Sequence, residues 1–226
     1  LIQGEEEIVV SREDMIVVDD AIVALLEGGK IRRLPKRNFT AESIASEKPV
    51  FIMETQTDRR LRFFTSHGNC LIIGVDELPE VRLTAKATNL NSLVQLEKDE
   101  EIVACFDEVK DDTLVFFTAL GNAKRTEGKE FDLRTKKTAA IALKDDDRVI
   151  AVEKQDETAG TVIMVSKGGM SIRFATDTVP IMGKGAGGVK CMKLDEGDRV
   201  IFAAQIADEG EILTISDRGY AKRSLV

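Results

Sequence analysis

A glycine between two short apolar runs recurs five times along this chain of 226 residues. The five segments align on the glycines of AIVALLEGGKIRRLP, RLRFFTSHGNCLIIG, TLVFFTALGNAKRTE, TVIMVSKGGMSIRFA and EILTISDRGYAKRSL, which are Gly29, Gly68, Gly121, Gly169 and Gly219. Successive glycines are 39, 53, 48 and 50 residues apart. Because a tight turn needs a residue at positive φ, each segment predicts a β-hairpin.

A second motif lies between these hairpins. In LEKDEEIVACF, LKDDDRVIAVE and LDEGDRVIFAA a leucine precedes a β-branched run by six residues, with acidic residues between them. IASEKPVFIME follows the same spacing from Ile44 to Val50, and IQGEEEIVV gives a weaker match. We interpret the acidic cluster as a turn and the run after it as a strand.

Two motifs that keep their order at a period near 50 residues define the expected fold. About four strands per period is typical of a propeller blade, and single blades must stack because each is too small to bury its own faces. We therefore predict one all-β, propeller-like domain over residues 1–226, with incomplete terminal blades. The predicted blades are residues 1–43, 44–95, 96–142, 143–193 and 194–226. A two-sheet sandwich is the alternative, but it would not repeat both motifs in phase.

Composition limits the possible classes of protein. Charged residues make up 32% of the chain, and no apolar run approaches the roughly 18–20 residues that span a bilayer. Nothing at the start resembles a signal peptide, and the chain begins at Leu1, so we expect a piece of a longer protein. Cys70, Cys105 and Cys191 favour buried thiols in a reducing cytosol over a disulfide framework or a metal site.

The charge distribution suggests a partner, although the net charge is −8. Acidic residues gather in the turn motif, at Glu5 to Glu7, Glu97 to Glu101, Asp145 to Asp147 and Asp195 to Asp198. Basic residues concentrate just past the hairpin glycines. Because equivalent positions of a repeat fall on one rim, we predict a basic belt separated from an acidic one. The candidate DNA-binding residues are Lys30, Arg32, Arg33, Lys36, Arg37, Lys124, Arg125, Arg173, Lys184, Lys190, Lys222 and Arg223.

A belt of lysine and arginine with few aromatic residues suits the backbone of duplex DNA. Single-strand binders use stacking platforms, and Tyr220 is the one exposed-looking candidate. The alternative is that these pairs only solubilise the surface. The second blade has no Lys-Arg pair in HGNCLIIGVDELPE, so we expect that part of the rim to bind poorly.

The least strand-like segment is PIMGKGAGGVKCMKL, from Pro180 to Leu194. It is not a Walker A loop, because no Gly-Lys-Ser/Thr follows at the required spacing and no helix pattern opens after it. We predict a flexible connector whose backbone amides, with Lys184 and Lys190, approach DNA phosphates.

These motifs together resemble the C-terminal domain of the A subunit of bacterial type IIA topoisomerases, which include gyrase and topoisomerase IV. GKGAGGV follows a Gly-x-x-x-Arg hairpin and precedes L-x-x-G-D-x-V, and GNAKRTEGKEFD and GYAKRSL match the hairpins of that family. FFTSHGNCLIIGVDELPEV with LVQLEKDEEIVACF is more similar to the topoisomerase IV branch. The resemblance covers residues 15–226.

The resemblance implies a β-pinwheel, a propeller variant in which neighbouring blades exchange strands. It also implies that the basic rim bends duplex DNA and presents it to a catalytic core elsewhere in the parent enzyme. The gyrase box, Gln-Arg-Arg-Gly-Gly-Lys-Gly, is missing after the first hairpin, where the chain has LPKRNFTAESIASEKP. The Pro180–Leu194 loop keeps a degenerate form of it. This departure favours decatenation and relaxation over wrapping for supercoiling, with a gyrase that has lost its box as the alternative.

The implied partners are duplex DNA, the remainder of the A subunit, and the ATPase B subunit. They would meet in the bacterial cytoplasm at the nucleoid, without a membrane. The parent enzyme would use ATP and Mg²⁺ elsewhere, and this domain would hold no cofactor.

We expect no catalysis by this chain. His67 is the single histidine, at a hairpin tip, and the single tyrosine, Tyr220, follows a hairpin glycine, whereas the reactive tyrosine of the family lies in a separate domain. Asp145 to Asp147 belong to the repeating turn, which favours a structural role over magnesium binding. Outside the family, the alternative function is a protein-interaction propeller that uses the loops of one face.

Overall fold

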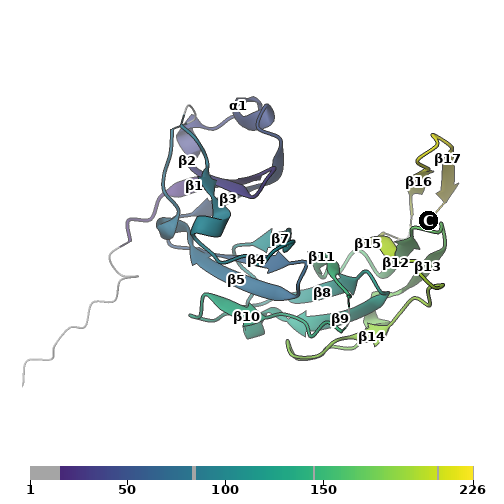
Figure 1. The fold of residues 1–226 in the computed structure, drawn as a ribbon. Helices are drawn as coiled ribbons and strands as arrows, with labels where there is room; N and C mark the ends of the chain where they lie inside the picture. The colour runs from purple at the N-terminus through teal and green to yellow at the C-terminus, as the bar shows by residue number, and fades with distance from the viewer. Residues whose placement is uncertain (1–15, 83–84, 145, 208, 226) are drawn as a thin grey trace, which may run out of the picture. The chain divides into compact units, whose positions relative to one another are not determined.

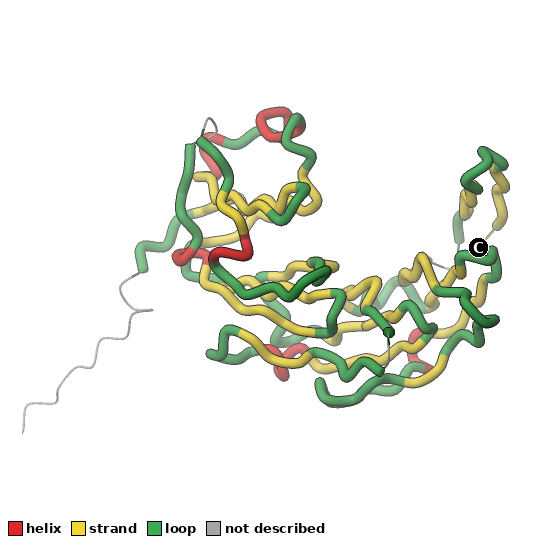
Figure 2. The backbone as a smooth tube through the Cα atoms, in the orientation of Figure 1, coloured by secondary structure: helices red, strands yellow, loops and turns green. Residues whose placement is uncertain are grey.

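The computed structural model describes residues 16–82, 85–144, 146–207 and 209–225, so the acidic run Glu5 to Glu7, the weaker IQGEEEIVV match and Asp145 lie outside the described residues. The described chain is built from short strands, with one α-helix, α1 (Ala41–Ala45), and short 3-10 turns (Figures 1 and 2). The all-β prediction is confirmed.

All five predicted hairpins are present. They are β1 (Asp20–Leu26) with β2 (Lys30–Pro35), β4 (Arg60–Thr65) with β5 (Asn69–Gly74), β8 (Thr113–Thr118) with β9 (Asn122–Glu127), β12 (Thr161–Ser166) with β13 (Ser171–Ala175), and β16 (Glu211–Ile215) with β17 (Ala221–Leu225). The aligned glycines have φ between 70° and 87°, which is the left-handed conformation that the repeat predicts.

The β-branched run after each leucine motif is also a strand. These strands are β3 (Pro49–Gln56), β7 (Ile102–Phe106), β11 (Val149–Lys154) and β15 (Val200–Ile206). Each lies beside the first strand of the hairpin before it, so β3 pairs with β1, β7 with β4, β11 with β8 and β15 with β12.

Three shorter strands are exchanged between repeats. β6 (Thr88–Asn89), β10 (Lys137–Ala139) and β14 (Val189–Lys190) each follow one hairpin but pair with the second strand of the hairpin before it. The resulting sheets have the orders β3-β1-β2-β6, β10-β5-β4-β7 and β11-β8-β9-β14. β13-β12-β15 has three strands and β16-β17 has two. The expected strand exchange is confirmed, and each four-stranded sheet gathers residues from successive repeats.

The chain divides into two compact units. One combines the residues up to Arg62 with Ile72–Lys98, and the other combines Phe63–Leu71 with the residues from Asp99 onward. The core of the first unit is an aliphatic cluster against which Phe39 and Ala87 pack. Its buried members are Ile22, Ala24, Leu26, Leu34 and Ile44.

The second unit shows why the blades must stack. Phe116 of β8 lies edge-on to Phe64 of β4, with ring centroids 5.5 Å apart. Its neighbour Phe117 is also fully buried but belongs to a cluster with Val162 and Met164 of β12. Because successive strand residues point to opposite faces, β8 is covered on both sides. Each such aromatic pair contributes about 0.5–1.5 kcal/mol beyond its buried area.

The three cysteines are free thiols, with Cys70 buried and Cys105 and Cys191 half-buried. Burial raises the pKa of Cys105 and of Cys191. Thiols of raised pKa are poor nucleophiles at neutral pH, which fits a structural role.

Within the described residues, the structure has no helix with the length and apolar character needed to cross a membrane.

Candidate nucleic-acid interface

The Lys124 side chain is buried, which contradicts its predicted place on an exposed rim. Its exposed fraction is 0%, and its Nζ donates to the carbonyl oxygens of Gly183 at 3.0 Å and Lys184 at 3.1 Å. The ammonium also lies 5.3 Å from the ring centroid of Phe116. Burial lowers the pKa of Lys124 to about 8. The physical reason is that the glycine-rich segment of the next repeat covers β9, and its carbonyl oxygens need donors.

Arg125 holds the beginning of the same segment. Its Nε donates to the carbonyl oxygen of Val179 at 2.6 Å, and its Nη2 to that of Asp177 at 3.1 Å. Its backbone N–H donates to the carbonyl oxygen of Pro180 at 3.0 Å, and its own carbonyl accepts from Met182 at 2.7 Å. Arg125 is therefore half-buried and bound to protein.

Arg32 and Arg33 make equivalent contacts in the first unit. Arg32 is 3% exposed and donates to the carbonyl oxygens of Arg82 at 3.0 Å and Ala85 at 2.7 Å. Arg33 is half-buried and donates to the carbonyl oxygen of Val75 at 3.0 Å. The rim prediction is wrong for Arg32, as it is for Lys124. In both repeats, the cations three and four residues after the glycine bind a loop of the next repeat.

The other predicted residues lie nearer the surface. Lys184 is half-buried, and exposed side chains belong to Lys30, Lys36, Arg37, Arg173, Lys190, Lys222 and Arg223. Several of these exposed cations have protein partners. Lys36 pairs with Glu54, and Arg223 lies 3.3 Å from Glu211. Lys190 Nζ donates to the Leu120 carbonyl oxygen at 2.8 Å, and Arg173 Nε donates to Thr161 Oγ1 at 3.1 Å. Such exposed contacts are weak and leave these side chains able to exchange partners.

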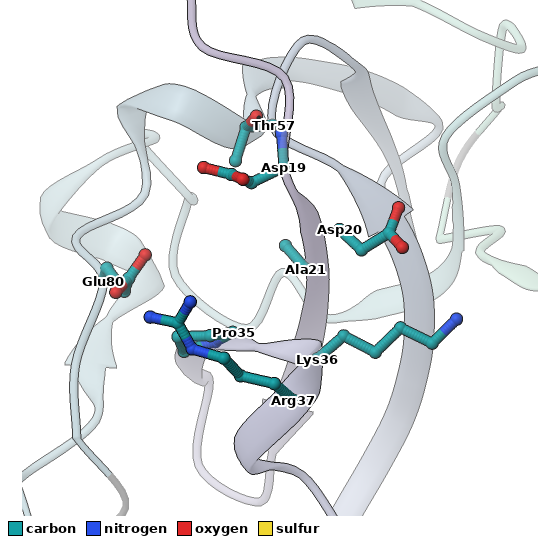
Figure 3. A pocket seen from close by; sticks show the side chains of 8 residues that line it. All are labelled: Asp19, Asp20, Ala21, Pro35, Lys36, Arg37, Thr57 and Glu80. Atoms are coloured by element: carbon teal, nitrogen blue, oxygen red, sulfur yellow. Dashed lines mark hydrogen bonds between the residues drawn. The ribbon is translucent and has the colours of Figure 1, made fainter.

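Lys36 and Arg37 line a pocket of about 520 Å³ in the first unit (Figure 3). Asp19, Asp20 and Glu80 line it as well, and Figure 3 shows the Arg37 guanidinium on the Glu80 side of the pocket. Three carboxylates beside two cations make this pocket a poor phosphate site, because they cancel the positive potential.

A further set of exposed cations was not predicted from the sequence. They lie on the exchanged strands β6, β10 and β14 or in the loops that lead into them, as do Lys184 and Lys190. The additional residues are Arg82, Lys86, Arg134, Lys136 and Lys137, and we call the seven residues together the loop cations. Figure 1 shows β10 and β14 along the lower edge of the second unit. The sequence did carry a signal, because the first cation of each loop follows its hairpin glycine by 14, 13 and 15 residues, at Arg82, Arg134 and Lys184.

In three of the turn motifs, one acidic residue caps a hairpin. Asp147 Oδ1 accepts from the backbone N–H of Leu120 at 2.8 Å, and its Oδ2 accepts from Asn122 Nδ2 at 3.1 Å. Asp198 Oδ1 accepts from the N–H of Gly168 at 2.9 Å in the next repeat. These carboxylates replace water at exposed turns and fix the hairpin tips.

Arginines bridge the acidic turns of neighbouring repeats. Arg148 Nη1 donates to the carbonyl oxygen of Asp99 at 2.7 Å, and Arg199 pairs with the carboxylate of Asp146. The hydrogen bond from Arg199 lowers the pKa of Asp146. The expected segregation of acidic and basic belts is therefore incomplete, because basic side chains enter the acidic turns.

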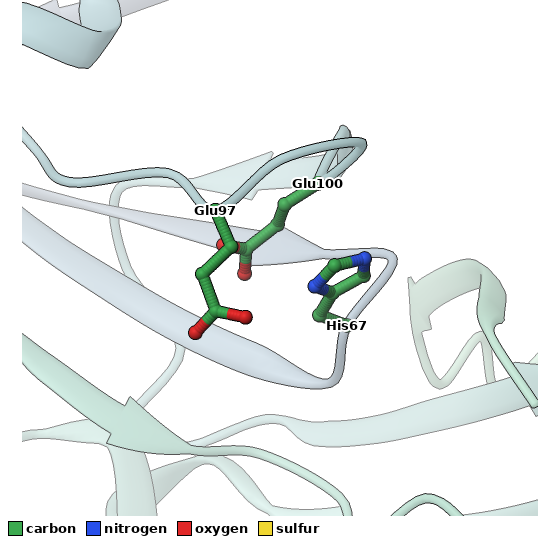
Figure 4. A group of neighbouring side chains, drawn as sticks. All are labelled: His67, Glu97 and Glu100. Atoms are coloured by element: carbon green, nitrogen blue, oxygen red, sulfur yellow. The ribbon is translucent and has the colours of Figure 1, made fainter. Parts of the chain in front are cut away.

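His67 and Glu100 lie close to the β4–β5 hairpin tip (Figure 4). Glu100 is buried, and its Oε1 accepts from Thr65 Oγ1 at 2.5 Å and from Asn69 Nδ2 at 2.7 Å. His67 Nε2 is 3.2 Å from Arg148 Nη1. Glu100 thus serves as the hairpin cap of its repeat, as Asp147 does. Tyr220 is 77% exposed at the turn between β16 and β17.

Antiparallel sheets that exchange a short strand with the next repeat define a β-propeller-type repeat domain. A family model, "DNA gyrase C-terminal domain, beta-propeller", matches residues 63–106, 112–156, 160–207 and 210–226. The chain belongs to this family, the C-terminal domains of type IIA topoisomerase A subunits.

Relatives from both branches of the family are similar to this chain. The A subunit of DNA topoisomerase 4 from Streptococcus pneumoniae serotype 4 is 32% identical over 92% of the chain and 27% of the relative. The A subunit of DNA gyrase from Escherichia coli K12 is also 32% identical, over 96% of the chain and 26% of the relative. The chain thus spans about a quarter of these curated relatives, and sequence identity does not separate the branches.

Solved structures from both branches have a fold similar to that of this chain. The C-terminal domain of DNA topoisomerase IV superposes with a TM-score of 0.82 at 26% identity, covering 92% of this chain and 68% of the other. The DNA gyrase A C-terminal domain gives a TM-score of 0.61 at 25% identity, covering 91% and 71%. The resemblance stated from the sequence is confirmed at the level of family and fold.

Proposed function

We propose that this domain binds and bends duplex DNA for a type IIA topoisomerase, through the loop cations. The observation that carries the proposal is the recurrence of lysines and arginines in the segments of three successive repeats that contain β6, β10 and β14. All of them are exposed except the half-buried Lys184, although the chain is acidic overall. Cations that recur along the sequence suit the regularly spaced phosphates of a duplex. Exposed hairpin cations such as Lys30 and Lys222 are further candidates for contact with phosphates.

Binding of this kind is independent of sequence and depends steeply on salt. Each phosphate neutralised by a lysine or arginine contributes about −0.9 to the slope of log K against log salt. If all seven loop cations contact phosphates, the loops alone give a slope near −6. The same cations fix no base identity, because they contact only the backbone.

Within the family, we propose decatenation and relaxation by a topoisomerase IV-like enzyme. The segment after the first hairpin, LPKRNFTAESIASEKP, has no gyrase box and instead forms a 3-10 turn and α1. The domain would then act with the remainder of the A subunit, and with the ATPase B subunit, on the chromosome in the bacterial cytoplasm. ATP and Mg²⁺ would be used in those other parts. The alternative is a gyrase domain that wraps DNA for supercoiling.

The experiment compares the wild-type chain with a triple variant, Arg134→Ala, Lys136→Ala and Lys137→Ala, for binding to a 40-base-pair duplex by fluorescence anisotropy at several salt concentrations. The proposal predicts weaker binding and a slope shallower by about 2–3. A matched control removes three exposed cations that belong neither to the loop cations nor to the hairpins. Its substitutions are Arg59→Ala, Lys98→Ala and Lys110→Ala. Equal losses in the two triple variants would contradict a specific role for the loops, and a protein-interaction propeller would show no salt-dependent binding in any of them.

A further inference from the structure

The glycine-rich loop is fastened to the body of the second unit along its length. Its first residues are held by the backbone of Arg125, which exchanges hydrogen bonds with Pro180 and Met182. The Arg125 guanidinium holds the chain just before the loop, where it donates to the carbonyl oxygens of Asp177 and Val179. Its middle is held by Lys124 Nζ, which donates to the carbonyl oxygens of Gly183 and Lys184. Two neighbouring residues of β9 therefore hold a segment that lies more than 50 residues away in sequence.

Contacts from other elements complete the fastening. The backbone N–H of Lys184 donates to Glu130 Oε2 at 2.8 Å, and the N–H of Ala142 donates to the carbonyl oxygen of Ala186 at 3.3 Å. A Cβ on Gly188 would lie 2.7 Å from the carbonyl oxygen of Ala123, and one on Gly187 would lie 2.8 Å from that of Ala142. These two glycines thus permit close backbone approach, a role different from the flexible linker expected from composition.

The burial of Lys124 indicates that its ammonium group has a specific role in holding the loop. A lysine side chain is seldom fully buried, and the desolvation of its charge disfavours the fold. Here the ammonium is compensated by two carbonyl oxygens and the Phe116 ring, and Glu130 contributes a favourable charge. An apolar residue would fill the same space but would leave the carbonyl oxygens of Gly183 and Lys184 without this donor.

We propose that Lys124 and Arg125 form a positioning clamp that sets the course of the glycine-rich loop, and with it the places of the Lys184 and Lys190 ammonium groups for contact with phosphates. The role of these two ammonium groups rests on the proposed DNA binding. Arg32, through the carbonyl oxygens of Arg82 and Ala85, forms the corresponding clamp in the first unit. On this proposal, Lys124 and Arg125 affect DNA binding indirectly, because they position the loop that contacts the DNA.

The test uses the full 226-residue chain and the variant Lys124→Met, which keeps an unbranched apolar stem and removes the donor. Lys154→Met is the matched control, because Lys154 Nζ also lies over a phenylalanine, 5.7 Å from the ring centroid of Phe106, and pairs with Asp112, away from the loop. Both variants lose one positive charge. Arg125→Gln is the second clamp variant, which keeps the proposal testable if Lys124→Met fails to fold.

Two readouts separate the clamp from the DNA proposal. The first is amide hydrogen exchange over Met182–Val189 without DNA, which should become about tenfold faster in Lys124→Met or Arg125→Gln and stay unchanged in Lys154→Met. The second is the affinity for a 40-base-pair duplex at low salt, which should fall several-fold further in the clamp variants than in Lys154→Met. Lys124→Arg, which keeps a donor at this position, should restore exchange protection at least partly.

Unchanged loop exchange in both clamp variants would overturn the clamp. Faster exchange with the same DNA affinity as Lys154→Met would overturn the positioning role. If the wild-type chain binds no duplex, the proposed function fails and the positioning role with it, while the exchange experiment still decides whether Lys124 and Arg125 hold the loop.

Discussion

Asp147 fixes a hairpin tip 27 residues before it, because its Oδ1 accepts from the backbone N–H of Leu120 at 2.8 Å. Glu100 and Asp198 occupy the same place in the neighbouring repeats, four residues after the leucine of the turn motif, and contact the hairpins at Thr65 and Gly168. In the first repeat that place is taken by Lys48, whose Nζ lies 3.1 Å from Glu27 Oε2, so the charges are reversed. We call this contact between a carboxylate of the acidic turn and the preceding hairpin the hairpin lock.

The lock makes Asp147 more important for stability than its neighbour Asp146. Asp147→Ala leaves the Leu120 N–H and the Asn122 amide without their acceptor, and should lower the free energy of unfolding by about 1–3 kcal/mol. Asp146→Ala removes only an exposed pair with Arg199 and should cost clearly less. Urea denaturation followed by circular dichroism measures both, and equal effects would show that Asp147 is not a lock.

Two hairpin glycines offer a matched test of packing around the turn. Gly121 and Gly169 have similar φ, 81° and 87°, so alanine should cost each about 1–2 kcal/mol of backbone strain. At Gly121 the new Cβ would also lie 2.6 Å from the carbonyl oxygen of Met192, whereas nothing lies within 4 Å at Gly169. Gly121→Ala should therefore be destabilising by at least about 1 kcal/mol more. Equal midpoints in urea would contradict the close approach of the segment after β14.

Because the ammonium of Lys124 is buried, we expect the free energy of unfolding to increase at alkaline pH. Its pKa is about 8 in the folded chain against 10.5 for an ordinary lysine, so the unfolded chain holds more protons between these values. Stability should then rise with pH across that window, by up to about 1.4 kcal/mol per pH unit. Subtracting the profile of Lys124→Met isolates this contribution. A difference profile that is flat from pH 8 to 10.5, or that falls, would contradict the burial of a charged Lys124.

The repeat made much of this fold predictable. The glycine intervals locate all five hairpins, and the leucine motif locates β3, β7, β11 and β15, because turn geometry and apolar runs are local properties. The exchanged pairing of β6, β10 and β14 is not local, since strands of two or three residues leave almost no pattern, and it came only with the family resemblance.

The site was predicted less well, for a physical reason. Lys124 and Lys222 occupy equivalent places in their hairpins, yet Lys124 is covered by a loop about 60 residues away and Lys222 is exposed. Whether a cation lies at the surface depends on which segment of the next repeat covers it. The sequence of the hairpin alone does not determine this. The spacing of residues such as Arg134 from the hairpin glycines was a signal in the sequence, but its meaning became clear only once the exchanged strands were located.

The central claim is that the loop cations bind and bend duplex DNA. The most direct measurement is the salt-dependent titration of the wild-type chain onto a 40-base-pair duplex that carries a fluorescent donor and acceptor at its ends. We predict binding that weakens steeply with salt and a rise in energy transfer as the ends approach, with little dependence on base sequence. Absence of binding at low salt, or binding with unchanged energy transfer, would contradict the account.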